Sequence, residues 1–141
     1  MASPTSTRKR ITHWLDTTGR VFAESPLTAL STSALSLTLL PPSRRPQHAA
    51  YYPRPVHLGL FSAAFLLSAG MCQQGYTVDA AGTGAAWGTL FLAVNGWKRG
   101  VRGVLKGRLA PAVLVGKVLF DTAVLGWYWG NTRRWVPDAE R

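Results

Sequence analysis

The stretch VHLGLFSAAFLLSAGMCQQGYTV, Val56–Val78, contains no Asp, Glu, Lys or Arg anywhere along its length. The next run, Ala80–Trp97, is also free of these charges, and a third run, Leu109–Thr132, is interrupted only by Lys117 and Asp121. A helix needs roughly 20 residues to cross a bilayer core of about 30 Å. All three runs meet or approach that length and are apolar nearly all round, so they predict three transmembrane helices.

Buried helices of a soluble domain are the alternative interpretation of these runs. Soluble helices carry a polar stripe every three to four residues, which these segments lack, and the rest of the chain is too short to bury them. Charged residues make up only 16% of the chain, against about 25% in soluble domains. The pI near 10.9 would also suit a nucleic-acid binder, but the charge-free runs exclude nucleic acid as the partner.

A weaker hydrophobic segment precedes these runs. Pro26–Leu40 is shorter than a full span and holds six Ser or Thr, which suits an interfacial or partly inserted helix. We therefore predict an all-α membrane protein with three strong transmembrane helices plus a weak N-terminal hydrophobic helix, a candidate fourth span. The expected divisions are a basic amphipathic segment (1–24), a short hydrophobic helix (25–41), a Pro/Arg-rich extended linker (42–55), a transmembrane helical domain (56–132) and a polar tail (133–141).

Basic residues between the spans set the expected orientation, because basic loops stay on the cytoplasmic or matrix side. With three spans, residues 1–55 join the basic loop on that side, which gives 12 Lys and Arg against 3 at the C-terminus. With Pro26–Leu40 as a fourth span the split is 8 against 7, so three spans are preferred. Asp79 is the only charge in the first connection, which predicts a tight hairpin. The matrix-side loop then contains Lys98, Arg99, Arg102, Lys106 and Arg108.

The N-terminal segment has the composition of a mitochondrial transit peptide, since it is rich in Ser, Thr, Arg and Lys. Arg8, Lys9 and Arg10 precede apolar residues at helical spacing, among them Ile11, Trp14 and Phe22. We expect an uncleaved docking helix on an anionic membrane or a partner. The following segment, Ser43–His57, contains three Pro, which predicts either an extended arm on a neighbouring protein or a plain solvated linker.

The sequence offers no catalytic or metal-binding pattern. His13, His48 and His57 pair with no Cys or acid at ligand spacing, and the single cysteine, Cys72, rules out Cys-based metal sites. Gly84 and Gly88, Gly96 and Gly100, and Gly126 and Gly130 are each one helical turn apart. Small residues at that spacing predict close helix packing in lipid.

Lys117 and Asp121 lie one turn apart, on one face of the last predicted span. Ionisable residues at this depth are costly and mark functional positions. Three interpretations remain open: an ion pair that neutralises itself, a contact with a polar group of another subunit, or part of a proton or ion route. At the ends of the spans, Trp97, Trp127, Tyr128 and Trp129 are typical of interfacial anchors.

The stretch from Gly82 to Lys98, in which a small-residue segment with Trp87 leads into Leu90-Phe91-Leu92 and then Gly96-Trp97-Lys98, resembles the fungal altered-inheritance-of-mitochondria family. The basic loop with Gly107-Arg108 and Pro111 continues the resemblance, whose clear part covers residues 56–130. Through this family the chain is similar to the fungal complex I accessory subunit called NUXM.

The resemblance implies a multi-pass inner-membrane protein of mitochondria, bound to membrane-arm subunits of the respiratory NADH:ubiquinone oxidoreductase. The family brings no catalytic signature, so we expect no enzyme activity and no cofactor of the chain's own. Bound phospholipid and contacts with anionic lipids are expected as well. A small oligomeric inner-membrane transporter or channel is the alternative, although the sequence shows no inverted repeat.

Overall fold

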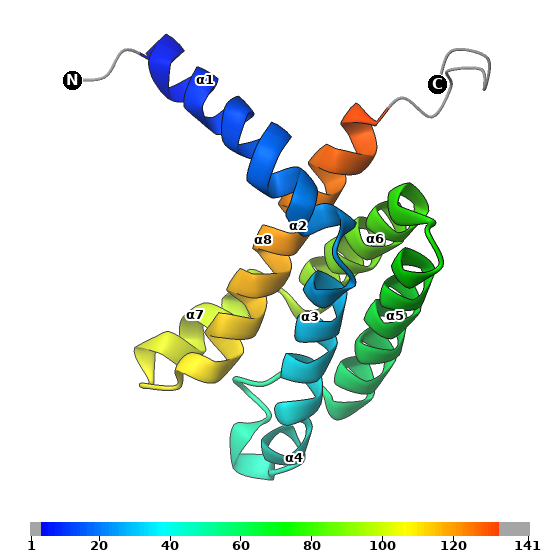
Figure 1. Cartoon of the computed structure of the whole chain (residues 1–141). Helices are drawn as coiled ribbons and strands as arrows, with labels where there is room; N and C mark the ends of the chain where they lie inside the picture. The colour runs from blue at the N-terminus through cyan, green and yellow to red at the C-terminus, as the bar shows by residue number, and fades with distance from the viewer. Residues whose placement is uncertain (1–3, 133–141) are drawn as a thin grey trace.

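The computed structural model describes residues 4–132, without the side chains of residues 4, 5, 97 and 100. Throughout the described part the regular structure is helical (Figure 1). The longer helices are α1 (Pro4–Trp14), α3 (Pro26–Thr38), α5 (Pro55–Gln73), α6 (Thr77–Asn95), α7 (Trp97–Leu105) and α8 (Leu109–Asn131). Short pieces connect them: the π-helix η1 (Leu15–Gly19), α2 (Arg20–Glu24), α4 (Leu40–Ser43) and the 3-10 helix η2 (Pro46–His48).

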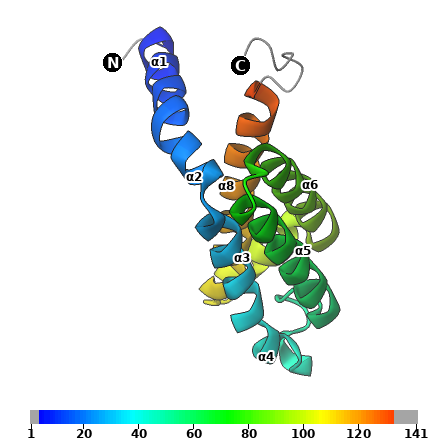
Figure 2. The same ribbon diagram turned by 45° about the vertical axis from the view of Figure 1, so that its right-hand side comes forward.

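Helices α3, α5, α6 and α8 form the bundle, with α5 packed between α3 and α6, and α6 packed on α8. The chain passes along the bundle four times, so that α1 and the end of α8 lie at one end while α4 and α7 lie at the other (Figures 1 and 2). A tight hairpin joins α5 and α6, as expected, but it lies before Asp79, which is in the first turn of α6. The connection spans three residues and turns at Gly75, whose φ of 90° disfavours other residues.

Two of the three expected spans, α5 and α8, are long and apolar enough to cross a membrane. Helix α6 has the length but not the hydropathy, because glycines take the place of large apolar residues where it packs against α8, among them Gly84 and Gly88. The expectation of three strong spans was therefore wrong. Only 44% of the apolar window in α5 and 39% of that in α8 is buried in the bundle. Soluble core helices are mostly buried, so these two are consistent with membrane association.

The weak segment forms helix α3 and packs along α5 and α8. Pro26 occupies the first turn, and the side chain of Ser25 accepts a hydrogen bond from the Leu27 amide. The helix therefore separates residues 4–24 from the basic loop, which lie at opposite ends of the bundle (Figure 1). The expectation that residues 1–55 share one face with Lys98–Arg108 does not hold in this arrangement.

The linker is turned rather than extended. Pro fixes φ at values that short helices also use, and α4 and η2 begin at or next to prolines. His48 stacks on Tyr52 at 5.3 Å between ring centroids, and its Nδ1 lies 3.1 Å from the carbonyl oxygen of Pro42. Tyr52 is 8% exposed, so the linker closes one end of the core.

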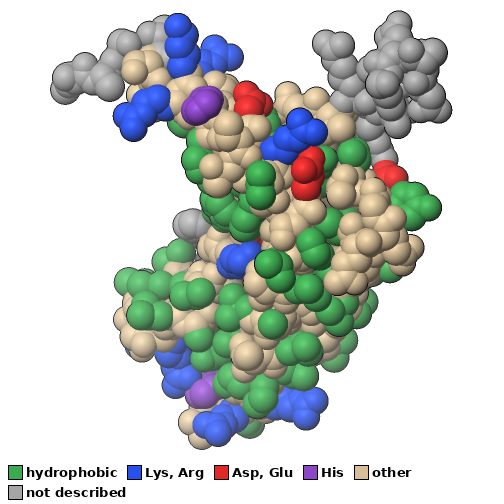
Figure 3. Space-filling model, viewed as in Figure 1, with side chains coloured by type: hydrophobic (Ala, Val, Ile, Leu, Met, Phe, Trp, Pro, Cys, Tyr) green, Lys and Arg blue, Asp and Glu red, His purple; other side chains and the backbone are tan. Residues whose placement is uncertain are grey.

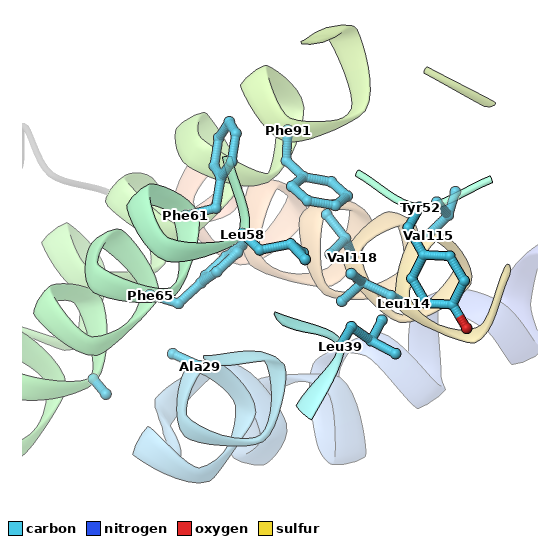
Figure 4. Close-up of a cluster of buried hydrophobic side chains, with 11 residues drawn as sticks. Ala29, Leu39, Tyr52, Leu58, Phe61, Phe65, Phe91, Leu114, Val115 and Val118 are labelled. Atoms are coloured by element: carbon cyan, nitrogen blue, oxygen red, sulfur yellow. The ribbon is translucent and has the colours of Figure 1, made fainter. Parts of the chain in front are cut away.

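The largest core cluster joins α3, the linker, α5, α6 and α8 (Figure 4). Phe61 packs edge-on against Phe91, with ring centroids 5.1 Å apart, and Phe65 lies on the same side of α5. Leu58, Leu114 and Val118 are fully buried beside them. Burial of a side chain of this size contributes about 1.5–3 kcal/mol in water, but in lipid the gain comes from packing.

Candidate functional site

A cluster of three polar side chains lies between α3 and α8. The Nζ of Lys117 donates to Oδ2 of Asp121 at 2.5 Å and to Oγ1 of Thr32 at 3.1 Å. The hydroxyl of Thr32 in turn donates to Asp121 Oδ2. Asp121 is 2% exposed, and the Phe22 ring lies over the ammonium at 5.5 Å. The geometry matches the interpretation in which the ion pair is neutralised inside the protein, with α3 as an added contact.

The cluster joins two helices through hydrogen bonds. Their spacing places Lys117 and Asp121 one turn apart on α8, and Thr32 reaches them from α3. Within residues 4–132, no group of three His, Cys, Asp or Glu could hold a metal ion. Asp121 Oδ1 is buried without a hydrogen-bond partner among the described residues. One carboxylate, one ammonium and one hydroxyl can hold helices together by charge-assisted hydrogen bonds.

A row of hydroxyls extends this polar interior along α3. The Oγ atoms of Ser33 and Ser62 lie 2.7 Å apart and join α3 to α5, while Ser68 donates to the Ala80 carbonyl at 2.8 Å and joins α5 to α6. Sequence reasoning missed these contacts. The signal was the spacing of Thr28, Thr32, Ser33 and Ser36, which places four hydroxyls on one face of a helix.

Glu24 forms a second polar centre at the α1 end. Its Oε1 accepts from Tyr128 Oη at 3.0 Å and from Arg20 Nε at 2.9 Å, and its carbonyl oxygen accepts from Cys72 Sγ at 3.0 Å. The Glu24 carboxylate raises the pKa of Arg20, which keeps its charge. Tyr128 is 6% exposed and joins α8 to α2, so it is an internal contact rather than the expected interfacial anchor.

The other expected anchors differ from one another. Trp127 is partly buried against the small core cluster at this end, whereas Trp129 is 44% exposed. Trp97 lies outside the described side chains. Only Trp129 therefore has the exposure that a ring in the interfacial layer would show.

The predicted packing glycines fall into two groups. A Cβ at Gly84 would lie 2.8 Å from Leu125 Cδ1, and one at Gly88 would overlap the Thr122 hydroxyl, so both glycines let α6 approach α8. A Cβ at Gly126 would lie 3.8 Å from Ala85 Cβ across the same contact.

The remaining three glycines have other surroundings. Gly96 ends α6 with φ of 68°, and a Cβ at Gly130 would meet nothing within 4 Å. These two were expected in helix contacts and lie elsewhere, because a helix end and an exposed face also accept glycine. Gly100 lies outside the described side chains.

An open groove of about 530 Å³ runs between α6 and α8. Most of its lining residues are small, and the ring of Trp129 lies over Gly82. The lining residues are Asp79, Gly82, Thr83, Ala85, Ala86, Thr89, Thr122, Gly126 and Trp129. A second cavity, beside Ser25, Ser68 and Cys72, measures about 10 Å³ and has room for at most about one water. The bundle interior is therefore packed at that point.

The predicted basic loop is largely helical. Lys98, Arg99 and Arg102 lie on α7, and Lys106 and Arg108 follow it. Arg99 donates to the Tyr52 carbonyl oxygen at 3.4 Å, and the guanidinium of Arg108 lies 5.6 Å from the Tyr51 ring centroid. The loop and the linker thus form one basic end of the molecule, which also contains Arg44, Arg45 and Arg54.

These features define an all-helical protein whose bundle contains two apolar helices suited to membrane association. Residues 22–129 match the family altered inheritance of mitochondria protein 19, and the chain belongs to this family. The match confirms the family resemblance seen in the sequence, while the likeness to NUXM stays a prediction. No curated protein and no solved structure matches the chain.

Proposed function

We propose that the chain is a non-catalytic accessory subunit of mitochondrial respiratory complex I, embedded in the inner membrane as a multi-pass helical bundle. The observation that carries the membrane part is the distribution of side chains around the bundle. Several hydroxyls, among them those of Thr32, Ser33 and Ser62, are buried together with Asp121. Large apolar residues are exposed on every bundle helix, including Leu27, Leu66, Leu90 and Leu119. In water this distribution would be reversed.

The surface agrees with this location. In Figure 3, hydrophobic side chains cover the middle of the face shown, while most Lys and Arg gather at its two ends. Twenty large hydrophobic side chains are exposed among the described residues, and large exposed apolar patches mark contacts with membranes or partners. Lipid or neighbouring membrane helices would cover such a surface.

The accessory role is supported by the packed interior and by the family. The ion pair and the hydroxyl row hold neighbouring helices together, which favours a structural role over the alternative transporter or channel. A transporter site would combine broken helices with a cavity at mid-membrane. The assignment to complex I rests on the resemblance to its accessory subunit, and the family's link to mitochondria supports the compartment.

We propose the groove between α6 and α8 as the contact with a helix of a membrane-arm subunit. Most of its lining residues are small, which lets a second helix backbone approach closely in lipid. Trp129, which also lines the groove, supplies a large ring for the contact.

Native gels of mitochondria solubilised in mild detergent test the proposal. The tagged protein should migrate with the band that stains for NADH dehydrogenase activity. Ala86→Leu, which fills the groove, should weaken this co-migration, whereas Ala63→Leu on the exposed face of α5 is the matched control and should leave it intact. Migration of the wild-type protein only as a free small species would contradict the proposal.

A further inference from the structure

Helix α7 presents three chemically different faces. Its glycine face lies against the start of α8, where a Cβ at Gly103 would lie 3.0 Å from the Arg108 carbonyl oxygen and 3.7 Å from Pro111 Cγ. The second face is apolar and open, with Val101 41%, Val104 48% and Leu105 79% exposed. The close packing of Gly103 on the start of α8 therefore orients α7 so that the face with Val101, Val104 and Leu105 is exposed.

The third face is basic and adjoins the apolar one. Lys98 and Arg102 lie one helical turn apart on α7, and Lys106, the first residue after the helix, continues the same stripe; all three are exposed. Arg44 and Arg45 are exposed at the same end of the molecule. No Asp or Glu occurs between residues 25 and 78 or between 80 and 120, so no acidic residue of these segments neutralises the stripe.

We propose that α7 is an interfacial helix that binds an anionic phospholipid, with the lipid phosphate on the Lys98–Arg102–Lys106 stripe and an acyl chain along Val101, Val104 and Leu105. An exposed apolar stripe beside an exposed basic stripe is the pattern of helices that lie in the headgroup layer. Basic clusters next to membrane helices on the matrix side bind anionic headgroups. The inference rests on the proposed membrane location of the bundle.

Charge complementarity together with the apolar stripe selects this ligand. An acidic protein surface would match the basic stripe but would leave Leu105 beside it in water. A phospholipid satisfies both stripes because its phosphate and acyl chains are joined in one molecule. Helix α7 packs on α8, so the basic and apolar stripes lie beside the first residues of α8 (Figure 1). In the proposed membrane arrangement, this is the depth of the lipid headgroups.

Native mass spectrometry of the full-length protein in detergent tests the proposal, with phosphatidylglycerol and phosphatidylcholine of identical acyl chains as probes. The wild-type protein should prefer phosphatidylglycerol. Arg102→Gln/Lys106→Gln should weaken phosphatidylglycerol binding by about fivefold for each charge removed. Lys9→Gln/Arg10→Gln removes the same charge from α1, at the opposite end, and should change binding less than twofold. Leu105→Ser should weaken both lipids and keep the preference for the anionic one.

Equal binding of the two lipids by the wild-type protein would overturn the proposal. An acidic protein surface would then be the favoured partner of the basic stripe. Equal losses in the α7 and α1 double variants would also overturn it, because attraction by net charge alone would then be sufficient. This measurement uses the purified protein and does not depend on complex I. A preference for phosphatidylglycerol would therefore remain valid even if the protein did not co-migrate with complex I on native gels.

Discussion

The middle of the bundle and the end formed by α4 and α7 place their polar groups in opposite positions. In the middle, Thr32, Ser33 and Asp121 are buried, while Leu66, Leu90 and Leu119 are exposed. At the end, Arg44, Arg102 and Lys106 are exposed and Tyr52 is buried. In a bundle surrounded by water along its whole length, we expect the same distribution of buried and exposed polar groups in the middle and at the ends. The difference supports the proposal that the middle lies in an apolar surrounding and that the charged groups of the end lie in a hydrated one.

The largest expected effect comes from breaking the ion pair in the middle. Lys117→Met leaves the carboxylate of Asp121 buried with only the Thr32 hydroxyl, and an unpaired charge near the centre of a span costs about 2.5–3.5 kcal/mol. Asp121→Asn should cost less, because the Lys117 side chain is 26% exposed and can reach outward. Thermal unfolding of the purified protein in detergent measures both variants.

The double variant Lys117→Met/Asp121→Asn is the control for this comparison. Removing both charges leaves no unpaired ion, so it should be more stable than Lys117→Met alone. Electron transfer per assembled complex should stay unchanged in all three variants. Normal assembly with coupled turnover reduced in Asp121→Asn, and not rescued by the second change, would instead favour the proton-route interpretation.

A smaller effect is expected where α6 meets α8. Gly88→Ala places a methyl group on the Thr122 hydroxyl and should lower the free energy of unfolding by about 1–3 kcal/mol. Gly116→Ala on the open side of α8 meets nothing within 4 Å and should be neutral or stabilising by up to about 1 kcal/mol. Equal melting temperatures for the two variants would show that α6 and α8 do not pack as described.

The smallest effect concerns the hydroxyl row. Ser33→Ala and Ser62→Ala each remove one side of a hydrogen bond between α3 and α5. In membranes such a bond contributes about 0.6 kcal/mol, so a double-mutant cycle on unfolding should give a coupling energy of this size. A coupling near zero would mean that the hydrogen bond between Ser33 and Ser62 does not contribute to holding α3 against α5.

The helices themselves were predictable because long apolar runs leave few alternatives. Leu109–Thr132 became α8 with nearly the expected bounds, whereas α5 ends at Gln73, five residues before the expected Val78. Lys117 and Asp121 pair on one face of α8, as their spacing allowed. The position of α3 was not predictable from length and charge. The hydroxyls on one face of α3 lower its hydropathy, so the segment was predicted as a weak hydrophobic helix. The same hydroxyls make the contacts with Ser62 and Asp121.

The linker and Tyr128 were misjudged for a related reason. Proline content predicted extended backbone, whereas the stacking of His48 on Tyr52 stabilises a turned segment. An aromatic residue at the end of a span suits an interfacial anchor, but the Glu24 carboxylate gives Tyr128 a partner inside the bundle. Both contacts join residues from different segments of the chain, and no local pattern reports them.

Side-specific cysteine labelling tests most directly whether the bundle crosses the inner membrane with its basic end in the matrix. In a Cys72→Ser background, a membrane-impermeant maleimide added to intact mitoplasts should label Gln74→Cys in the α5–α6 turn. It should label Arg45→Cys only after the matrix side is opened, and Leu66→Cys in the middle of α5 under neither condition. Labelling of both end positions from the same side, or of Leu66→Cys in intact mitoplasts, would contradict the account.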